Sequence, residues 1–103
     1  MKTAINNKEK LLALVAANRQ RIKQYGVKTL GLFGLFVPNT NTNQSDVNLL
    51  VDFELEKETY RNFIGLAYCL EELFGRRVEV VTTNGLSLYI GPHILKEVEY
   101  VSL

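Results

Sequence analysis

Apolar residues recur along this chain with helical spacing in two stretches and in short continuous runs elsewhere. The stretch from about Lys8 to Tyr25 predicts an amphipathic helix that is capped by Asn6 or Asn7 and ends at Gly26. The stretch from Thr59 to Phe74 predicts a second long helix that stops at Gly75. A short last helix is expected to start at Gly91-Pro92. The continuous runs predict three strands, at Val27 to Phe33, Val47 to Phe53 and Arg77 to Thr82.

The order helix, strand, strand, helix, strand, helix predicts an α+β fold, an α/β sandwich in which helices pack on a small sheet. About a dozen residues join the first two strands, which is enough for either an antiparallel link or a crossover. With 103 residues, 47% of them apolar and 22% charged, the chain is expected to form one domain over residues 1–103.

Charge and composition narrow the possible functions. The net charge of +1 gives no long-range attraction to nucleic acid, and no apolar run approaches the roughly 18 residues of a membrane helix. The single cysteine, Cys69, is expected to be a buried thiol and fits a reducing, cytoplasmic location. The only histidine, His93, is expected at a helix start or on the surface.

The segment between the first two predicted strands carries the main functional signal. Gly34-Leu35 follows the first apolar run, and Asp46-Val-Asn48 opens the second, with a polar loop over residues 38–45 between them. This spacing resembles the signature of the minimal nucleotidyltransferases of the DNA polymerase β superfamily, Gly-Ser followed ten residues later by Asp-x-Asp. The resemblance runs from about Leu11 to Val101 and implies a small mixed sheet packed on helices.

The resemblance also implies a catalytic site. Residues i and i+2 of a strand point to the same face, so paired carboxylates at this spacing can converge on metal ions. The resemblance places Asp46 and Asn48 at these two positions and Glu79 at the third family carboxylate. It implies Mg²⁺ and ATP as cofactors, with Asp46 and Glu79 as the metal ligands. The residue-level alternative for Glu79 is a polar position on a half-exposed strand.

Three positions depart from the family pattern. At the nucleotide-binding turn, Leu35 replaces the serine that should follow Gly34, and Pro38 replaces an arginine that would meet phosphate. Asn48 replaces the second aspartate, so Mg²⁺ and ATP are expected to bind weakly. Leu35 also begins an apolar cluster, residues 35–37, which is either core or a contact surface. Arg76 and Arg77 are expected to serve the helix terminus or to face solvent.

Two main hypotheses for function follow from the resemblance. Minimal nucleotidyltransferases commonly occur as antitoxins paired with a helical HEPN-domain protein. The first hypothesis is a degenerate family member, catalytically weak or inactive, that binds such a partner. The alternative is an active Mg²⁺-dependent enzyme that transfers AMP from ATP to a protein partner. A homo-oligomeric scaffold is a third possibility, and neither nucleic acid nor a membrane is an expected partner.

Overall fold

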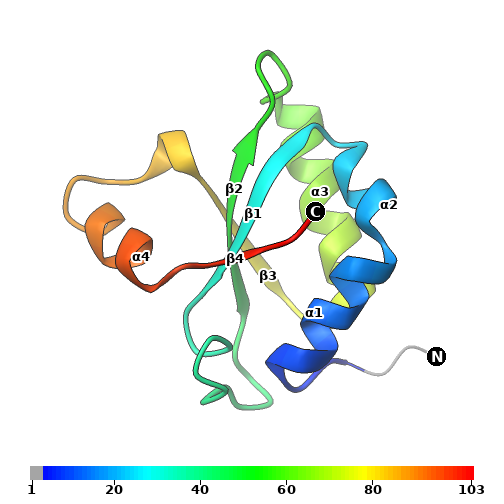
Figure 1. The fold of residues 1–103 in the computed structure, drawn as a ribbon, viewed down its shortest axis with the longest axis vertical. Coiled ribbons are helices and arrows are strands. Elements are labelled where there is room, and N and C mark those ends of the chain that lie inside the picture. Colours follow the sequence, from blue (N-terminus) through cyan, green and yellow to red (C-terminus); the bar gives the residue numbers. More distant parts are fainter. Residues whose placement is uncertain (1–3) are drawn as a thin grey trace.

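The computed structural model describes residues 4–103, which form a four-stranded sheet with helices on both sides (Figure 1). Helices α1 (Lys8–Ala17), α2 (Arg19–Lys23) and α3 (Tyr60–Phe74) lie together against one face of the sheet. Helix α4 (Gly91–Glu97) lies on the opposite side. Among the residues described, no helix is long and apolar enough to cross a membrane.

The sheet is mixed, with strand order β3-β2-β1-β4. Strand β1 (Val27–Phe33) pairs antiparallel with β2 (Val47–Phe53) and with β4 (Glu99–Val101), and β2 pairs parallel with β3 (Val78–Thr82). The expected α+β fold with a small mixed sheet is therefore confirmed, and the link between the first two strands is antiparallel. Both predicted strands of that pair have the predicted bounds, whereas β4 was not predicted.

The helices differ from prediction at one point, because the expected long first helix is broken at Asn18. Its backbone leaves the helical region, at φ −123° and ψ 25°, and its side-chain Nδ2 donates a hydrogen bond to the Leu14 carbonyl at 2.8 Å. An asparagine amide that bonds locally to the backbone competes with helix continuation in this way. The other predicted ends hold: Asn7 caps α1, and α3 ends at Gly75, whose φ of 67° suits glycine.

The main core lies between the three helices and the sheet. Alternate residues of β2, beginning with Val47, face this core, while Asn48 and Leu50 belong to the opposite face by strand parity. Leu50 is nevertheless buried, so the second face is also partly covered. Cys69 is buried, as predicted. An Arg21–Glu72 ion pair of 3.2 Å joins α2 to α3, and its hydrogen bond raises the pKa of Arg21.

The apolar cluster after β1, residues 35–37, is partly core and partly exposed surface. Phe36 is fully buried in the core, and Val37 packs against it. Leu35, by contrast, is 50% exposed. The turn that follows β1 is thus fixed to the core by one side chain and presents another to solvent.

Candidate functional site

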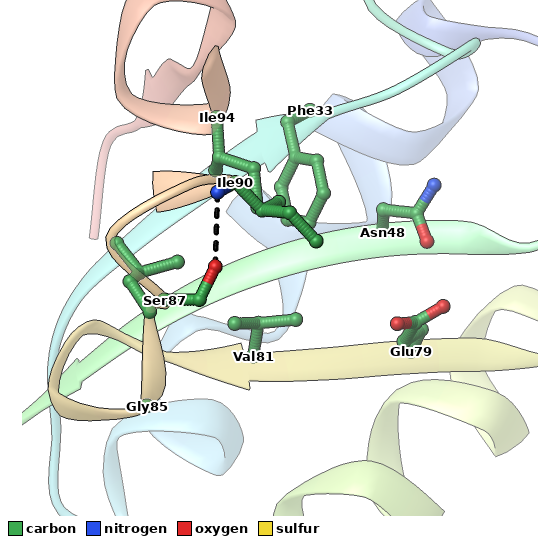
Figure 2. Close-up of a pocket in the computed structure, with 9 residues that line it drawn as sticks. Phe33, Asn48, Glu79, Val81, Gly85, Ser87, Ile90 and Ile94 are labelled. Atoms are coloured by element: carbon green, nitrogen blue, oxygen red, sulfur yellow. Dashed lines mark hydrogen bonds between the residues drawn. The ribbon is translucent and has the colours of Figure 1, made fainter. Parts of the chain in front are cut away.

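Asn48 and Glu79 meet on the sheet face that carries α4. They are direct register partners on the parallel strands β2 and β3, where neighbouring strands lie about 4.8 Å apart. Both line a cavity of about 420 Å³, and Figure 2 shows them side by side at one end of it. Ser87, Ile90 and Ile94 form the opposite wall, contributed by the segment that leads into α4 and by α4 itself.

The cavity is mostly apolar. Its lining includes five apolar side chains, namely Phe33, Val81, Leu86, Ile90 and Ile94. Among residues 4–103, Glu79 is the only charged residue in the lining. The Ser87 hydroxyl accepts a hydrogen bond from the Ile90 N–H at 2.9 Å. Within residues 4–103, the side chains of Asn48 and Glu79 form no hydrogen bond or ion pair, so their polar groups are available to a ligand.

Gly34 lies directly against Asn48, which links the two halves of the sequence signature. The φ of Gly34 is +82°, and a Cβ built there would lie 2.5 Å from Asn48 Nδ2. Only glycine fits both the backbone conformation and the space. Leu35, the next residue, lines a second cavity of about 410 Å³ together with Val37, Pro38 and Glu97. Among the residues described, that lining contains neither a hydroxyl nor a cationic side chain, and Glu97 is its only charge.

Asp46 is placed differently from the other two predicted site residues. It precedes β2, and its Oδ1 lies 3.9 Å from Nε of Arg77, an exposed side chain. Asp46 is not among the residues that line the cavity of Asn48 and Glu79. The structure therefore brings Asn48 and Glu79 together and leaves Asp46 at the start of the strand, next to a cation.

The donor set does not fit the metal pair of this superfamily. Two hard cations about 3.5 to 4 Å apart require several anionic oxygens, and here the register partner of Glu79 is the neutral side chain of Asn48, while Asp46 lies next to Arg77. Within residues 4–103, no group of three or more His, Cys, Asp or Glu side chains is arranged to hold a metal ion.

Arg76 has a role that sequence analysis missed. It was expected to serve the helix terminus or solvent, but its Nη1 donates hydrogen bonds to the carbonyls of Thr42 at 3.1 Å and Ser45 at 2.9 Å. Its guanidinium also lies 5.1 Å from the ring centre of Phe36. Arg76 therefore holds the polar loop, residues 38–45, against the core. Because its partners are backbone carbonyls distant in sequence, no local pattern could have indicated this contact.

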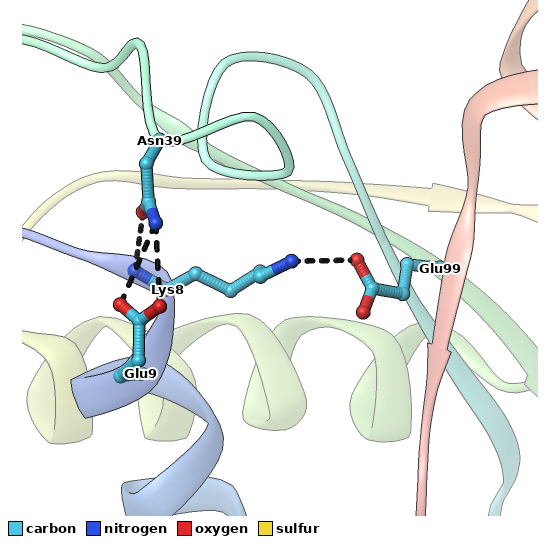
Figure 3. A network of polar contacts seen from close by, with 4 residues as sticks. All are labelled: Lys8, Glu9, Asn39 and Glu99. Atoms are coloured by element: carbon cyan, nitrogen blue, oxygen red, sulfur yellow. Dashed lines mark hydrogen bonds and ion pairs between the residues drawn. The ribbon is translucent and has the colours of Figure 1, made fainter.

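The same loop is held at a second point by the start of α1. Asn39 Oδ1 accepts a hydrogen bond from the Lys8 backbone N–H at 2.9 Å, and Asn39 Nδ2 donates to the Glu9 carboxylate (Figure 3). The Lys8 side chain extends the network to Glu99 of β4 through an ion pair of 3.0 Å. The loop between the two halves of the family signature is thus fixed to two distant parts of the fold.

This combination of a mixed sheet, a glycine turn after β1 and polar residues on β2 and β3 defines a minimal nucleotidyltransferase fold. The chain belongs to the nucleotidyltransferase domain family, whose model matches residues 14–101. It is 36% identical over 94 residues to the protein adenylyltransferase MntA of Thermococcus cleftensis, covering 90% of this chain and 94% of the relative. The resemblance inferred from the signature is therefore confirmed.

Solved structures agree with this assignment. A structure described as a minimal nucleotidyltransferase superposes with a TM-score of 0.71 at 28% identity and covers 85% of this chain and 93% of its own. One chain of a toxin–antitoxin complex with AMP-PNP superposes with a TM-score of 0.64, covering 89% of this chain and 69% of its own. At 17% identity, the second likeness establishes the fold alone.

Proposed function

We propose that this protein is a minimal nucleotidyltransferase-family member that acts by binding a protein partner, as an antitoxin does, and that AMP transfer is weak or lost. The observation that carries this proposal is the lining of the two cavities at the family site. Of the residues that the structure describes, the charged ones that line these cavities are Glu79 and Glu97. Proteins commonly hold a triphosphate with arginine or lysine side chains, and among the described residues neither lining supplies one.

The partner class follows from the family. Minimal nucleotidyltransferases commonly pair with a helical HEPN-domain protein, and one structural neighbour is a component of a toxin–antitoxin complex. Binding of a protein needs neither the missing serine hydroxyl at Leu35 nor the missing carboxylate at Asn48. A HEPN-type protein is therefore the partner that we propose.

AMP transfer from ATP to a protein is the second candidate function. The name of the 36%-identical relative, a protein adenylyltransferase, favours this function. In that case Asp46 and Glu79 are the acidic groups that remain, and Asn48 contributes one neutral oxygen. Removal of one preorganised electrostatic group from a catalytic site lowers the rate by about 10² to 10³. Three altered positions, Leu35, Pro38 and Asn48, therefore argue for a slow reaction at best.

Transfer of labelled AMP to a co-purified HEPN-domain protein separates the two functions. The wild type and Asn48→Asp are expected to give no transfer, because groups that act as a unit are not restored one at a time. A variant that also carries Leu35→Ser and Pro38→Arg tests whether the triphosphate contacts were the missing part. Robust transfer by the wild type, abolished by Asp46→Ala, would refute the binding-module proposal.

Binding is measured separately. Calorimetry of the wild type with Mg-ATP is expected to give no saturable heat at micromolar concentrations, whereas titration with the HEPN-domain protein is expected to give a defined complex. A micromolar dissociation constant for Mg-ATP would restore the enzyme hypothesis. Absence of any complex with HEPN-domain proteins would remove the antitoxin-like role.

A further inference from the structure

The two cavities of the candidate site are lined by neighbouring residues of the same two segments, and together they are called the acidic and apolar surface. Phe33 lines the first cavity and Gly34 lines the second, and these residues are consecutive. On α4, Ile94 lines the first and Glu97 the second, one helical turn further on. The two cavities therefore flank the same turn and the same helix, with Glu79 in one and Glu97 in the other.

The segment that forms one cavity wall also carries exposed apolar side chains, which are called the rim. Leu88 is 92% exposed, Tyr89 86% and Leu95 50%, and all three lie on the segment leading into α4 or on α4 itself. Large apolar side chains at this exposure are typical of a surface that a protein partner covers. The surface therefore combines an apolar rim with a cavity whose polar groups, Asn48 and Glu79, are unpartnered within residues 4–103.

We propose that the cavity of Asn48 and Glu79 receives an arginine side chain from the protein partner. This inference rests on the proposed partner-binding function and names the group that the site recognises. Glu79 supplies an anionic acceptor, and the Asn48 carbonyl supplies a second acceptor on the adjacent strand. A planar guanidinium has five donors and can bond to both groups at once, whereas the apolar walls contact its aliphatic stem.

The charge of the cavity lining disfavours a nucleoside triphosphate and favours an arginine side chain. In the part of the chain that the structure describes, no cationic residue lines either cavity, and Glu97 adds a second negative charge beyond the turn. Arginine is favoured over lysine because a guanidinium matches two acceptors on neighbouring strands, while an ammonium is a point charge. When the partner covers the rim, exclusion of water strengthens the ion pair with Glu79.

The test uses N-acetyl-arginine-methylamide as the probe and follows the backbone amides of the isotope-labelled protein by NMR. Saturable shifts at Asn48, Glu79 and Ile90 are expected, with a dissociation constant of about 1 mM, as suits a single side chain. The neutral citrulline analogue is expected to give no saturable shift. Glu79→Gln is expected to weaken binding at least about tenfold, because a charge-assisted hydrogen bond is lost.

Glu54→Gln is the matched control. It makes the same chemical change at an exposed residue just beyond the far end of β2, and binding is expected to equal that of wild type. The amide spectrum of each variant reports directly whether it is folded. Equal binding of the arginine and citrulline probes, or unchanged binding by folded Glu79→Gln, would overturn the inference.

Other occupants give distinct outcomes. Shifts at residues 88–95 that depend on protein concentration alone would identify a second copy as the occupant and overturn the inference. Saturation of the same amides by micromolar Mg-ATP would overturn both the inference and the proposed function. A HEPN-domain protein that binds wild type and Glu79→Gln equally would refute only the arginine contact, and the partner-binding function would stand.

Discussion

Replacing Arg76 by alanine is expected to destabilise the fold by about 3 kcal/mol. The change removes two hydrogen bonds from a charged donor, each contributing about 1.5 to 3 kcal/mol, and a contact with Phe36 of about 0.5 to 1 kcal/mol. Arg76 Nε is buried without a hydrogen-bond partner among residues 4–103, which is itself unfavourable. Removing this atom offsets part of the loss, so the expected net destabilisation is about 3 kcal/mol. For a domain of this size, 1 kcal/mol corresponds to roughly 4 to 8 °C in Tm.

Urea denaturation followed by circular dichroism measures this loss, and amide hydrogen exchange reports whether residues 38–45 become mobile. Arg77→Ala is the control, because Arg77 is the adjacent arginine but is 84% exposed and has only a 3.9 Å contact with Asp46. It is expected to change stability by less than about 0.5 kcal/mol. A similar small effect for Arg76→Ala, with exchange in the loop unchanged, would show that Arg76 does not hold the loop.

Two further substitutions test local features. Gly34→Ala is expected to destabilise the fold by about 2 kcal/mol, because of the positive φ and the contact with Asn48. In an Asn48→Ala background the expected loss is only about 1 kcal/mol, because the contact is absent. Equal losses in both backgrounds would refute the contact. Thr59→Ala is expected to destabilise by about 1 kcal/mol, because the Thr59 hydroxyl accepts a hydrogen bond from the Asn62 N–H at the start of α3; chemical denaturation that shows no loss would contradict this capping role.

The fold could be predicted wherever one local signal decided the outcome. The runs at β1 and β2 are continuous and apolar, and Gly75 marks the end of α3, so these bounds followed from the sequence. The break at Asn18 was missed because the helical apolar pattern continues through it. Strand β4 was missed because only Val101 of its three residues is shielded from solvent, so its pairing with β1 leaves little trace in the pattern.

The candidate site could be predicted in position but not in detail. The resemblance placed Asn48 and Glu79 at neighbouring family positions, and the parallel register of β2 and β3 does pair them. The apolar character of the cavity depends on Ile90 and Ile94, which sequence analysis left unassigned to any site. The contact of Asp46 with Arg77 is a tertiary detail that the spacing of the signature does not encode.

Strand β4 connects helix α4, which forms one wall of the cavity, to the sheet. It has three residues, and the ion pair that ties it to α1 joins positions 91 apart in sequence. Short edge strands with few buried contacts generally open at a lower free-energy cost than a protein core. Helix α4 ends two residues before β4, so release of that strand frees the wall that faces Asn48. We therefore expect local opening of β4 to widen the cavity without global unfolding, and amide hydrogen exchange at residues 99–101 measures that opening.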